Sequence, residues 1–512
     1  MPKLFFLFCG MFVRKKKNAS GKISVQVIDK SLGKYIVLHT VGSSANPTLL
    51  DQYVKLAHQW IKERKGVQEL DFSNERELFE RLADSITHFE LAGIRLLLGK
   101  LFDDIGFGVI KDDVFRYLVY YRLVFPRSKL KTTEFLARYH GIFWSDDTIY
   151  RYLDKLYNNQ KEKVQQISYQ HTLKIIGGEL KLVFYDVTTI YFEIDAEDNL
   201  RKTGYSKDGK AQHPQIVLGL LVSENGYPLT YDIFEGNKFE GHTMLPVIKS
   251  FKKKYSLDKL VIVADAGLLS ASNIKELTEQ KYEFILGARL KTEKQEVQQQ
   301  ILSLKLKNGE SHILQKDGLN LVVSYSDKRA AKDRQNREKG LRKLEKLLKS
   351  GKLTKANINN KGYNKFLTMQ GEIDVTLNKQ KILDDEKWDG LKGYVTNSDL
   401  SKEQIIINYG QLWNIEKAFR VAKSELKIRP VFHRLQRRIE AHICITFASY
   451  KIYKELERLL AQRHATISAG KAIEIAMSIF EISFEIPHSK ERFRRLILLS
   501  EEQKYLAKLF GF

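Results

Sequence analysis

Two short runs of aliphatic and aromatic residues are each followed directly by an aspartate. Leu182–Tyr185 precedes Asp186, and Leu260–Ala264 precedes Asp265. Because neither run alternates with polar residues, each is typical of a strand covered on both faces. Covered strands lie at the centre of α/β sheets, which gather ligands at the carboxyl ends of their strands. The pattern predicts two carboxylates that point into one crevice of a central sheet.

The segments around these runs predict the rest of the sheet. Two more strands, at 216–222 and 228–234, are joined through Asn225-Gly226, a strong hairpin signal. Helices are expected at 244–254 and 273–280, and a further strand at 282–287. The order is therefore β-β-β-α-β-α-β. This order is that of an α/β protein with an RNase H-like mixed sheet and helices on its faces.

The remaining segments suggest how the chain is divided. Alternation over 21–41 predicts a small hairpin, helical periodicity follows to about 178, and 290–390 is polar with a basic helical run, Lys328 to Lys352. A compact core does not tolerate a hundred residues of loop, so this stretch is expected to be an inserted, partly β subdomain. The predicted regions are 1–48 (N-terminal hairpin), 49–178 (helical), 179–289 (first core part), 290–390 (insertion), 391–450 (second core part) and 451–512 (C-terminal helices).

The helical region contains a candidate helix-turn-helix. Thr132 to Leu156 has a helix, a break at Gly141, and Ser145 placed as the N-cap of a second helix. That second helix would read DNA in a groove through Tyr150, Arg151 and Lys155. The alternative is an ordinary pair of packed helices.

The charge balance favours a polyanionic partner. The 512 residues hold 85 Lys and Arg against 62 Asp and Glu, a net charge of +23. Such an excess attracts nucleic acid through Coulomb forces and counterion release. A basic loop at 191–210 is a second candidate for DNA contact, although a solvated loop is the alternative; its residues are Tyr191, Lys202, Tyr205, Lys207 and Lys210.

Cysteine usage indicates a reducing compartment, and hydropathy gives no sign of a membrane span. Only Cys9 and Cys444 are present, which offers no disulfide framework. No apolar run approaches the roughly 18 residues of a membrane span. The apolar segment Leu4–Val13 has its positive charges on the wrong side for a signal peptide, and Met11 is an alternative start.

A third acidic residue completes a candidate metal site. Glu416 lies on a helix that follows the last core strand, 392–396. Three converging carboxylates repel one another unless cations lie between them. Oxygen ligands suit Mg²⁺ or Mn²⁺, and two such ions about 3.5–4 Å apart stabilise both oxygens of a phosphoryl transfer. The alternative is three unrelated, solvated carboxylates.

Several ordered motifs resemble those of DDE transposases of bacterial insertion sequences. The stretch 409–423, YGQLWNIEKAFRVAK, is similar to their Tyr-Arg-Glu-Lys signature, with matches at Tyr409, Glu416 and Lys423. The stretch 428–433, IRPVFH, is also similar to that group. Asp186-Val-Thr-Thr, Glu235-Gly-Asn and Ala264-Asp265-Ala-Gly resemble its other blocks. The resemblance covers about 180 to 450.

The resemblance implies a catalytic triad, Asp186, Asp265 and Glu416, that holds two Mg²⁺ or Mn²⁺ ions. It also implies that Tyr409 and Lys423 hold the DNA backbone near the cut. The chain departs from the signature at Leu412, where the family has arginine. Arg420 shares a helix face with Glu416 and Lys423, so it is a candidate for the missing charge. The alternative is that Arg420 only belongs to a solvent-exposed face of the helix.

The implied function is cut-and-paste transposition of an insertion sequence in the bacterial cytoplasm, in association with the nucleoid. The expected partners are double-stranded DNA, at the terminal inverted repeats and at the target, and a second copy of the chain when assembled on DNA; no membrane is expected. A structure-selective nuclease of the same fold is one alternative. An inactive, DNA-binding relative is another. The end sequence, the target preference and the formation of a hairpin intermediate cannot be read from the sequence.

Overall fold

The protein divides into two compact units. In the computed structural model, the described residues are 10–31, 33–64, 75–194, 196–207, 209–257, 259–350, 358–359, 362–370, 374–485 and 490–512. The first unit comprises Met1–Thr87 with Phe484–Arg492, and the second comprises His88–Ser483 with Phe493–Phe512. Of the apolar segment Leu4–Val13, residues 4–9 lie outside the described residues.

The first unit is a small α/β body. Its sheet has the order β1-β2-β3, with β1 Met11–Lys17, β2 Ile23–Asp29 and β3 Ile36–Ser44. The predicted hairpin is β2–β3. The sequence did not predict β1, because its run of basic residues does not have the pattern of a strand. Helix α1, Pro47–Arg64, packs Leu50 and Ala57 against Val25 and Val27 of β2. A second helix, α2, spans Glu75–Asp84.

The second unit begins with a group of helices. The main ones are α4 Lys100–Ile105, α5 Asp113–Val124, α6 Lys129–His140, α7 Asp146–Lys155 and α8 Lys161–Ile175. Shorter turns are α3 Ala92–Ile94, η1 Arg95–Gly99, η2 Phe107–Val109 and η3 Leu156–Gln160. The predicted helix–break–helix is present: Gly141 ends α6 with φ of 65°, and the Ser145 side chain caps α7 by accepting from the Thr148 amide.

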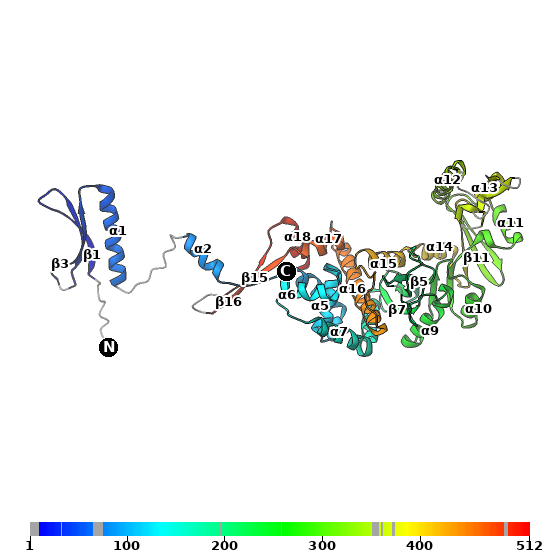
Figure 1. The fold of residues 1–512 in the computed structure, drawn as a ribbon, viewed down its shortest axis with the longest axis horizontal. Helices are drawn as coiled ribbons and strands as arrows, with labels where there is room; N and C mark the ends of the chain where they lie inside the picture. Colours follow the sequence, from blue (N-terminus) through cyan, green and yellow to red (C-terminus); the bar gives the residue numbers. More distant parts are fainter. Residues whose placement is uncertain are drawn as a thin grey trace. The chain divides into compact units, whose positions relative to one another are not determined.

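An eight-stranded mixed sheet forms the centre of this unit, in the order β10-β11-β14-β9-β8-β5-β6-β7. Strands β5 Leu182–Tyr191, β6 Gln215–Ser223 and β7 Pro228–Glu235 are antiparallel, whereas β8 Val261–Ala264 runs parallel to both β5 and β9 Glu283–Ala288. With α9 Met244–Tyr255 and α10 Ala271–Glu279, the element order is the predicted RNase H-like one. Figure 1 shows α9 beside β7.

The insertion is smaller than the sequence suggested. Strands β10 Ser311–Lys316 and β11 Leu319–Tyr325 belong to the main sheet, since β11 pairs with β14 Leu391–Thr396. Leu321, Val322 and Val323 of β11 are fully buried and continue the core on both faces of the sheet, which explains why β11 pairs there. A turn, η5 Leu290–Thr292, and a helix, α11 Gln295–Ser303, precede them.

The part of the insertion with its own core lies between β11 and β14. It holds α12 Asp327–Lys349, η7 Gly362–Phe366, β12 Leu367–Gln370, β13 Asp374–Leu377 and α13 Lys379–Glu386. Its small core contains Leu344, Phe366 and Leu367. The predicted basic helical run is α12, apart from Lys352, which lies outside the described residues.

The C-terminal part is mostly helical. It comprises α14 Lys402–Gly410, α15 Trp413–Ser424, α16 Gln436–Gln462, α17 Ala469–Ala476 and α18 Glu501–Phe510. Figure 1 shows α16 beside α5 and α7, against which it packs. The expectation of helices alone over 451–512 needs correction, because β15 Phe480–Glu485 and β16 Arg492–Ile497 form a three-stranded sheet with β4 Ile86–Glu90. The alternation of Phe480, Ile482 and Phe484 is the strand signal.

No helix in the described part of the chain is long and apolar enough to cross a membrane.

Candidate catalytic site

Asp186 lies within β5, and Asp265 directly follows β8, the parallel neighbour of β5. The last paired residues of β5 and β8 are Tyr185 and Ala264, so the two aspartates occupy the next position on each strand. Asp186 does not end its strand, as the sequence suggested, because β5 continues to Tyr191 against β6. It lies instead where the parallel neighbour stops. The sheet therefore brings two half-buried carboxylates together at one edge.

Each aspartate is held by a backbone hydrogen bond. The Val187 amide donates to Asp186 Oδ1 at 2.7 Å, and the Gly267 amide donates to Asp265 Oδ1 at 2.8 Å. Burial above all, together with the charge of Asp265, raises the pKa of Asp186 to about 7 against the opposing effect of Lys207. Two carboxylates this close and this poorly solvated favour a cation between them.

A lysine ammonium already lies beside this pair. Lys207 Nζ is 3.7 Å from Asp186 Oδ1, 3.1 Å from Glu240 Oε1, and donates to the Val187 carbonyl at 2.7 Å. Lys207 comes from the predicted basic loop, and Glu240 from the turn η4, Glu240–His242. Sequence reasoning missed Glu240, because it lies in neither a strand end nor a helix with a recognisable spacing. The ammonium shows that a cation fits at this edge of the sheet.

Glu416 lies on α15, which packs against β5. Its side chain is exposed, and its charge acts on Lys392 and on Tyr409. Within the part of the chain that the structure describes, no three carboxylate, histidine or cysteine side chains lie close enough to hold one metal ion. The structure thus brings the two aspartates together and places Glu416 on the adjoining helix. The oxygen-only donors, and the lysine cation beside them, fit a hard divalent ion such as Mg²⁺.

Tyr409 is buried, with 7% of its surface exposed, and the charge of Asp265 acts on it. Its ring packs against Tyr394, with centroids 4.8 Å apart, and Lys392 Nζ lies 4.4 Å from its centroid. Burial raises the pKa of Tyr409, and the charges of Asp265 and Glu416 raise it further. A cavity of about 240 Å³ adjoins it, lined among others by Ala266, Arg329 and Lys392. Tyr409 therefore lies within reach of the charges of both the second aspartate and the glutamate.

Gly287 on β9 provides the space for the Tyr409 hydroxyl. A Cβ at this position would lie 2.3 Å from Tyr409 Oη and 3.0 Å from the Ala266 amide nitrogen. We expect Gly287→Ala to lower the free energy of unfolding by about 1–3 kcal/mol, the usual cost of overpacking. Tyr409→Phe in the same chain should recover part of this loss, because it removes the closest atom. Denaturant unfolding of the four chains measures the coupling, and strictly additive effects would contradict this packing.

The other residues of the 409–423 motif occupy different environments. Leu412 is buried, so an arginine placed there would carry its charge into the core rather than toward a ligand. Arg420 is exposed on α15, and Lys423 is half-buried on the same helix. Leu412, where the chain departs from the motif, is thus a packing residue at the start of α15.

The candidate DNA-reading residues of α7 are engaged within the protein. Arg151 pairs with Asp147, and Lys155 Nζ lies 2.7 Å from Asp112 Oδ2. The Tyr150 ring packs under Arg438, whose Cζ is 4.7 Å from its centroid. Arg151 and Lys155 are exposed, while Ile149, Tyr152 and Leu153 form the buried face.

One family model matches this chain. Residues 179–452, more than half of the chain, match the family described as Transposase DDE domain. A cryo-EM structure of a piggyBac transposase synaptic complex with hairpin DNA is similar over 76% of this chain and 79% of that one, at 10% sequence identity and a TM-score of 0.38. No curated protein sequence matches this chain.

Proposed function

This chain belongs to the Transposase DDE domain family, and on that premise we propose that it cuts DNA at the ends of an insertion sequence and joins them to a target. The observation that carries the proposal is the position of Asp186 and Asp265, each directly after the last paired residues of β5 and β8, Tyr185 and Ala264. The net charge of +23 supports a DNA partner.

The proposed reaction is two successive transfers at phosphorus. A water oxygen forms a bond to a phosphorus at the element end, and the bond from that phosphorus to the 3′ oxygen breaks, which frees a 3′-hydroxyl. That hydroxyl later attacks a phosphorus of the target and displaces a target oxygen. Bound Mg²⁺ or Mn²⁺ ions would supply charge stabilisation for both transfers. No covalent bond between protein and DNA is needed.

In this proposal the protein's own residues bind the metal ions and orient the DNA. Asp186 and Asp265 would supply metal-binding oxygens from adjacent strands, and Glu416 a third from α15 once DNA is present. Lys207 would exchange its contact with Asp186 for one with a phosphate. On this proposal Arg420 and Lys423, on the same helix, lie beside the DNA backbone, and Tyr409 positions Asp265.

We further propose that the protein acts on double-stranded DNA in the bacterial cytoplasm and assembles as a homodimer on two element ends. In this arrangement α7 would contact the ends through Tyr150, Arg151 and Lys155. The pair of Arg151 with Asp147 is exposed and would open at little cost, whereas Lys155 would have to leave the mostly buried Asp112.

The test offers the full chain a pre-cut element end with a free 3′-hydroxyl, together with target DNA and Mg²⁺. A transposase joins the end to the target, whereas a nuclease of the same fold only hydrolyses DNA. Covalent end–target products resolved on a denaturing gel are the expected result. Hydrolysis without joined product would identify a nuclease and overturn the proposal.

A further inference from the structure

Two cationic side chains are buried where α5, α6 and α16 meet. Arg122 on α5 is 5% exposed, and Lys129, the first residue of α6, is 6% exposed. Arg122 donates to the Leu426 carbonyl at 3.4 Å and to His442 Nδ1 at 3.2 Å. Among the residues that the structure describes, neither forms an ion pair with a carboxylate. Burial, and then the like charge of Arg122, lowers the pKa of Lys129 well below its ordinary value.

Two histidines adjoin these cations. With Nδ1 accepting from Arg122, His442 Nε2 donates to the Ile428 carbonyl at 3.1 Å, and the His433 ring centroid is 5.5 Å from that of His442. Burial, with the nearby charges of Lys129 and Arg122, lowers the pKa of His433 to about 3. Both histidines are therefore neutral near pH 7, and His433, which is half-exposed, opens the cluster to the surface.

The backbone adds a further positive potential. Lys129 opens a twelve-residue helix that is capped by the Ser128 hydroxyl, which accepts from the Lys131 amide at 3.2 Å. The start of a helix carries a partial positive charge. Arg438 also lies near His433, but its charge is balanced by Asp154, whose Oδ1 is 3.1 Å from Arg438 Nε.

The cluster contacts the segment that follows α15, which is called the catalytic helix below because it carries Glu416. The segment from Leu426 to His433 links α15, which carries Glu416, to α16. Arg122 and His442 hydrogen-bond to carbonyls of this segment. His433 also contacts Tyr150 of α7 edge-on, with centroids 6.3 Å apart. An anion bound here would therefore touch the segment that follows the catalytic helix and the proposed DNA-reading helix.

Burying cations without a counter-charge is costly, because they lose hydration and gain mutual repulsion. A phosphate oxygen would offset both costs. We propose that Arg122, Lys129 and His433 form a binding site for a backbone phosphate of the DNA substrate. The inference rests on the proposed function, since DNA is the polyanion that this function supplies.

The test compares Lys129→Met with Lys131→Met in the full chain, without divalent metal. Lys131 is the matched control, because it lies on the same helix but is exposed and paired with Glu134. Binding to a duplex with an element end and to an unrelated duplex is measured over a range of salt concentrations. For Lys129→Met we expect similar weakening on both duplexes and a salt slope smaller by about one, the contribution of one phosphate contact. Lys131→Met should leave the slope unchanged.

Thermal melting of the free proteins supplies a second readout. Lys129→Met should melt at the same or a higher temperature, because it removes a buried, unbalanced charge. His433→Glu places a carboxylate beside Lys129, so it should raise the melting temperature and weaken duplex binding. This variant keeps the proposal testable if Lys129→Met fails to fold.

Two results would overturn the inference: an unchanged salt slope for Lys129→Met, or unweakened duplex binding by His433→Glu. Stabilisation of the wild type by inorganic phosphate alone, with duplex binding insensitive to both variants, would assign the site to free phosphate and also overturn it. A wild-type chain that binds neither duplex would instead contradict the proposed function, so the two failures are distinguishable.

Discussion

Replacing Asp265 with asparagine is expected to abolish DNA cleavage and strand joining together while leaving DNA binding intact. The amide keeps the size of the carboxylate and removes its charge. Metal stabilisation of transition-state charge contributes several kcal/mol, and since about 1.4 kcal/mol is tenfold, the rate should fall by about a thousandfold or more. Asp186→Asn should behave alike, because both residues lie at the same edge of the sheet.

A carboxylate of the same sheet outside the site provides the control. Asp232 lies on the edge strand β7, where its Oδ1 accepts from the Ile233 amide at 2.9 Å. Asp232→Asn should cleave and join at nearly the wild-type rate. Nicking of an end-containing duplex and a gel shift, run on the same preparations, separate chemistry from binding. Loss of binding in step with loss of cleavage would mean that the aspartates support the fold rather than the reaction.

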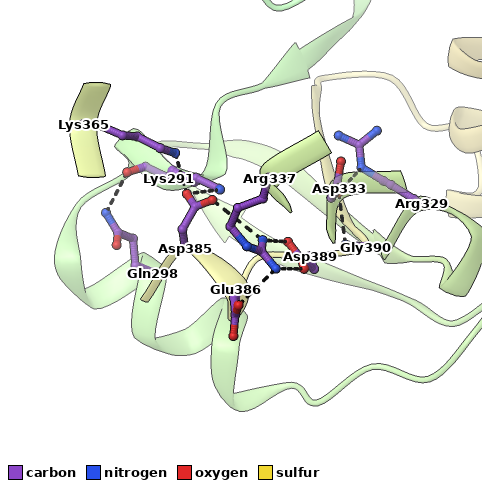
Figure 2. Close-up of polar contacts among 10 residues, drawn as sticks. All are labelled: Lys291, Gln298, Arg329, Asp333, Arg337, Lys365, Asp385, Glu386, Asp389 and Gly390. Atoms are coloured by element: carbon purple, nitrogen blue, oxygen red, sulfur yellow. Dashed lines mark hydrogen bonds and ion pairs between the residues drawn. The ribbon is translucent and has the colours of Figure 1, made fainter. Parts of the chain in front are cut away.

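The second large effect is expected at Arg337, which holds the insertion together. Its guanidinium is 5% exposed and pairs with both oxygens of Asp389, at 2.6 and 2.7 Å. Figure 2 shows Arg337 of α12 between Asp389 and Glu386, with Asp385 joined to Lys291 and Lys365 beside it. Removing one partner of a buried pair leaves the other charge uncompensated, at a cost of about 3–5 kcal/mol. Arg337→Met should therefore unfold α12 locally.

Amide hydrogen exchange of α12 measures this effect. Protection of the helix should fall by two or more orders of magnitude, the equivalent of roughly 3 kcal/mol, while protection of β5 and β8 is retained. Arg342→Met is the control on the same helix, because Arg342 is exposed and contacts only the Glu338 carbonyl among the described residues. Equal exchange in both variants would show that the Asp389 pair does not hold the insertion.

Much of the fold follows from local patterns in the sequence. The covered strands β5 and β8, and the hairpin at Asn225-Gly226, were predicted because burial on both faces and turn chemistry are local properties. The pairing of β11 with β14 was not predicted. A local sequence pattern can indicate a strand, but it does not tell which distant strand that strand pairs with. Strand β1 was missed because its basic residues, Arg14 to Lys17, form a continuous run that does not alternate with apolar residues.

The site was predictable in part, from the run of buried residues that precedes each aspartate. Asp186 and Asp265 were placed side by side on that basis, and the register of β5 and β8 agrees. The contact of Lys207 with Asp186, and the presence of Glu240, depend on loops whose paths the sequence does not encode locally. The burial of Tyr409 on α14 also required tertiary structure, because the space it fills is created by Gly287 on the distant strand β9.

The central claim is that the aspartate pair binds the catalytic metal, and metal rescue of Asp265→Cys tests it most directly. A thiolate is a poor ligand for Mg²⁺ but binds the softer Mn²⁺. The account predicts that this variant is inactive in Mg²⁺ and regains strand cleavage in Mn²⁺, while Asp232→Cys shows wild-type activity in both. Equal activity of Asp265→Cys in the two metals, whether full or absent, would contradict the assignment of Asp265 as a metal ligand.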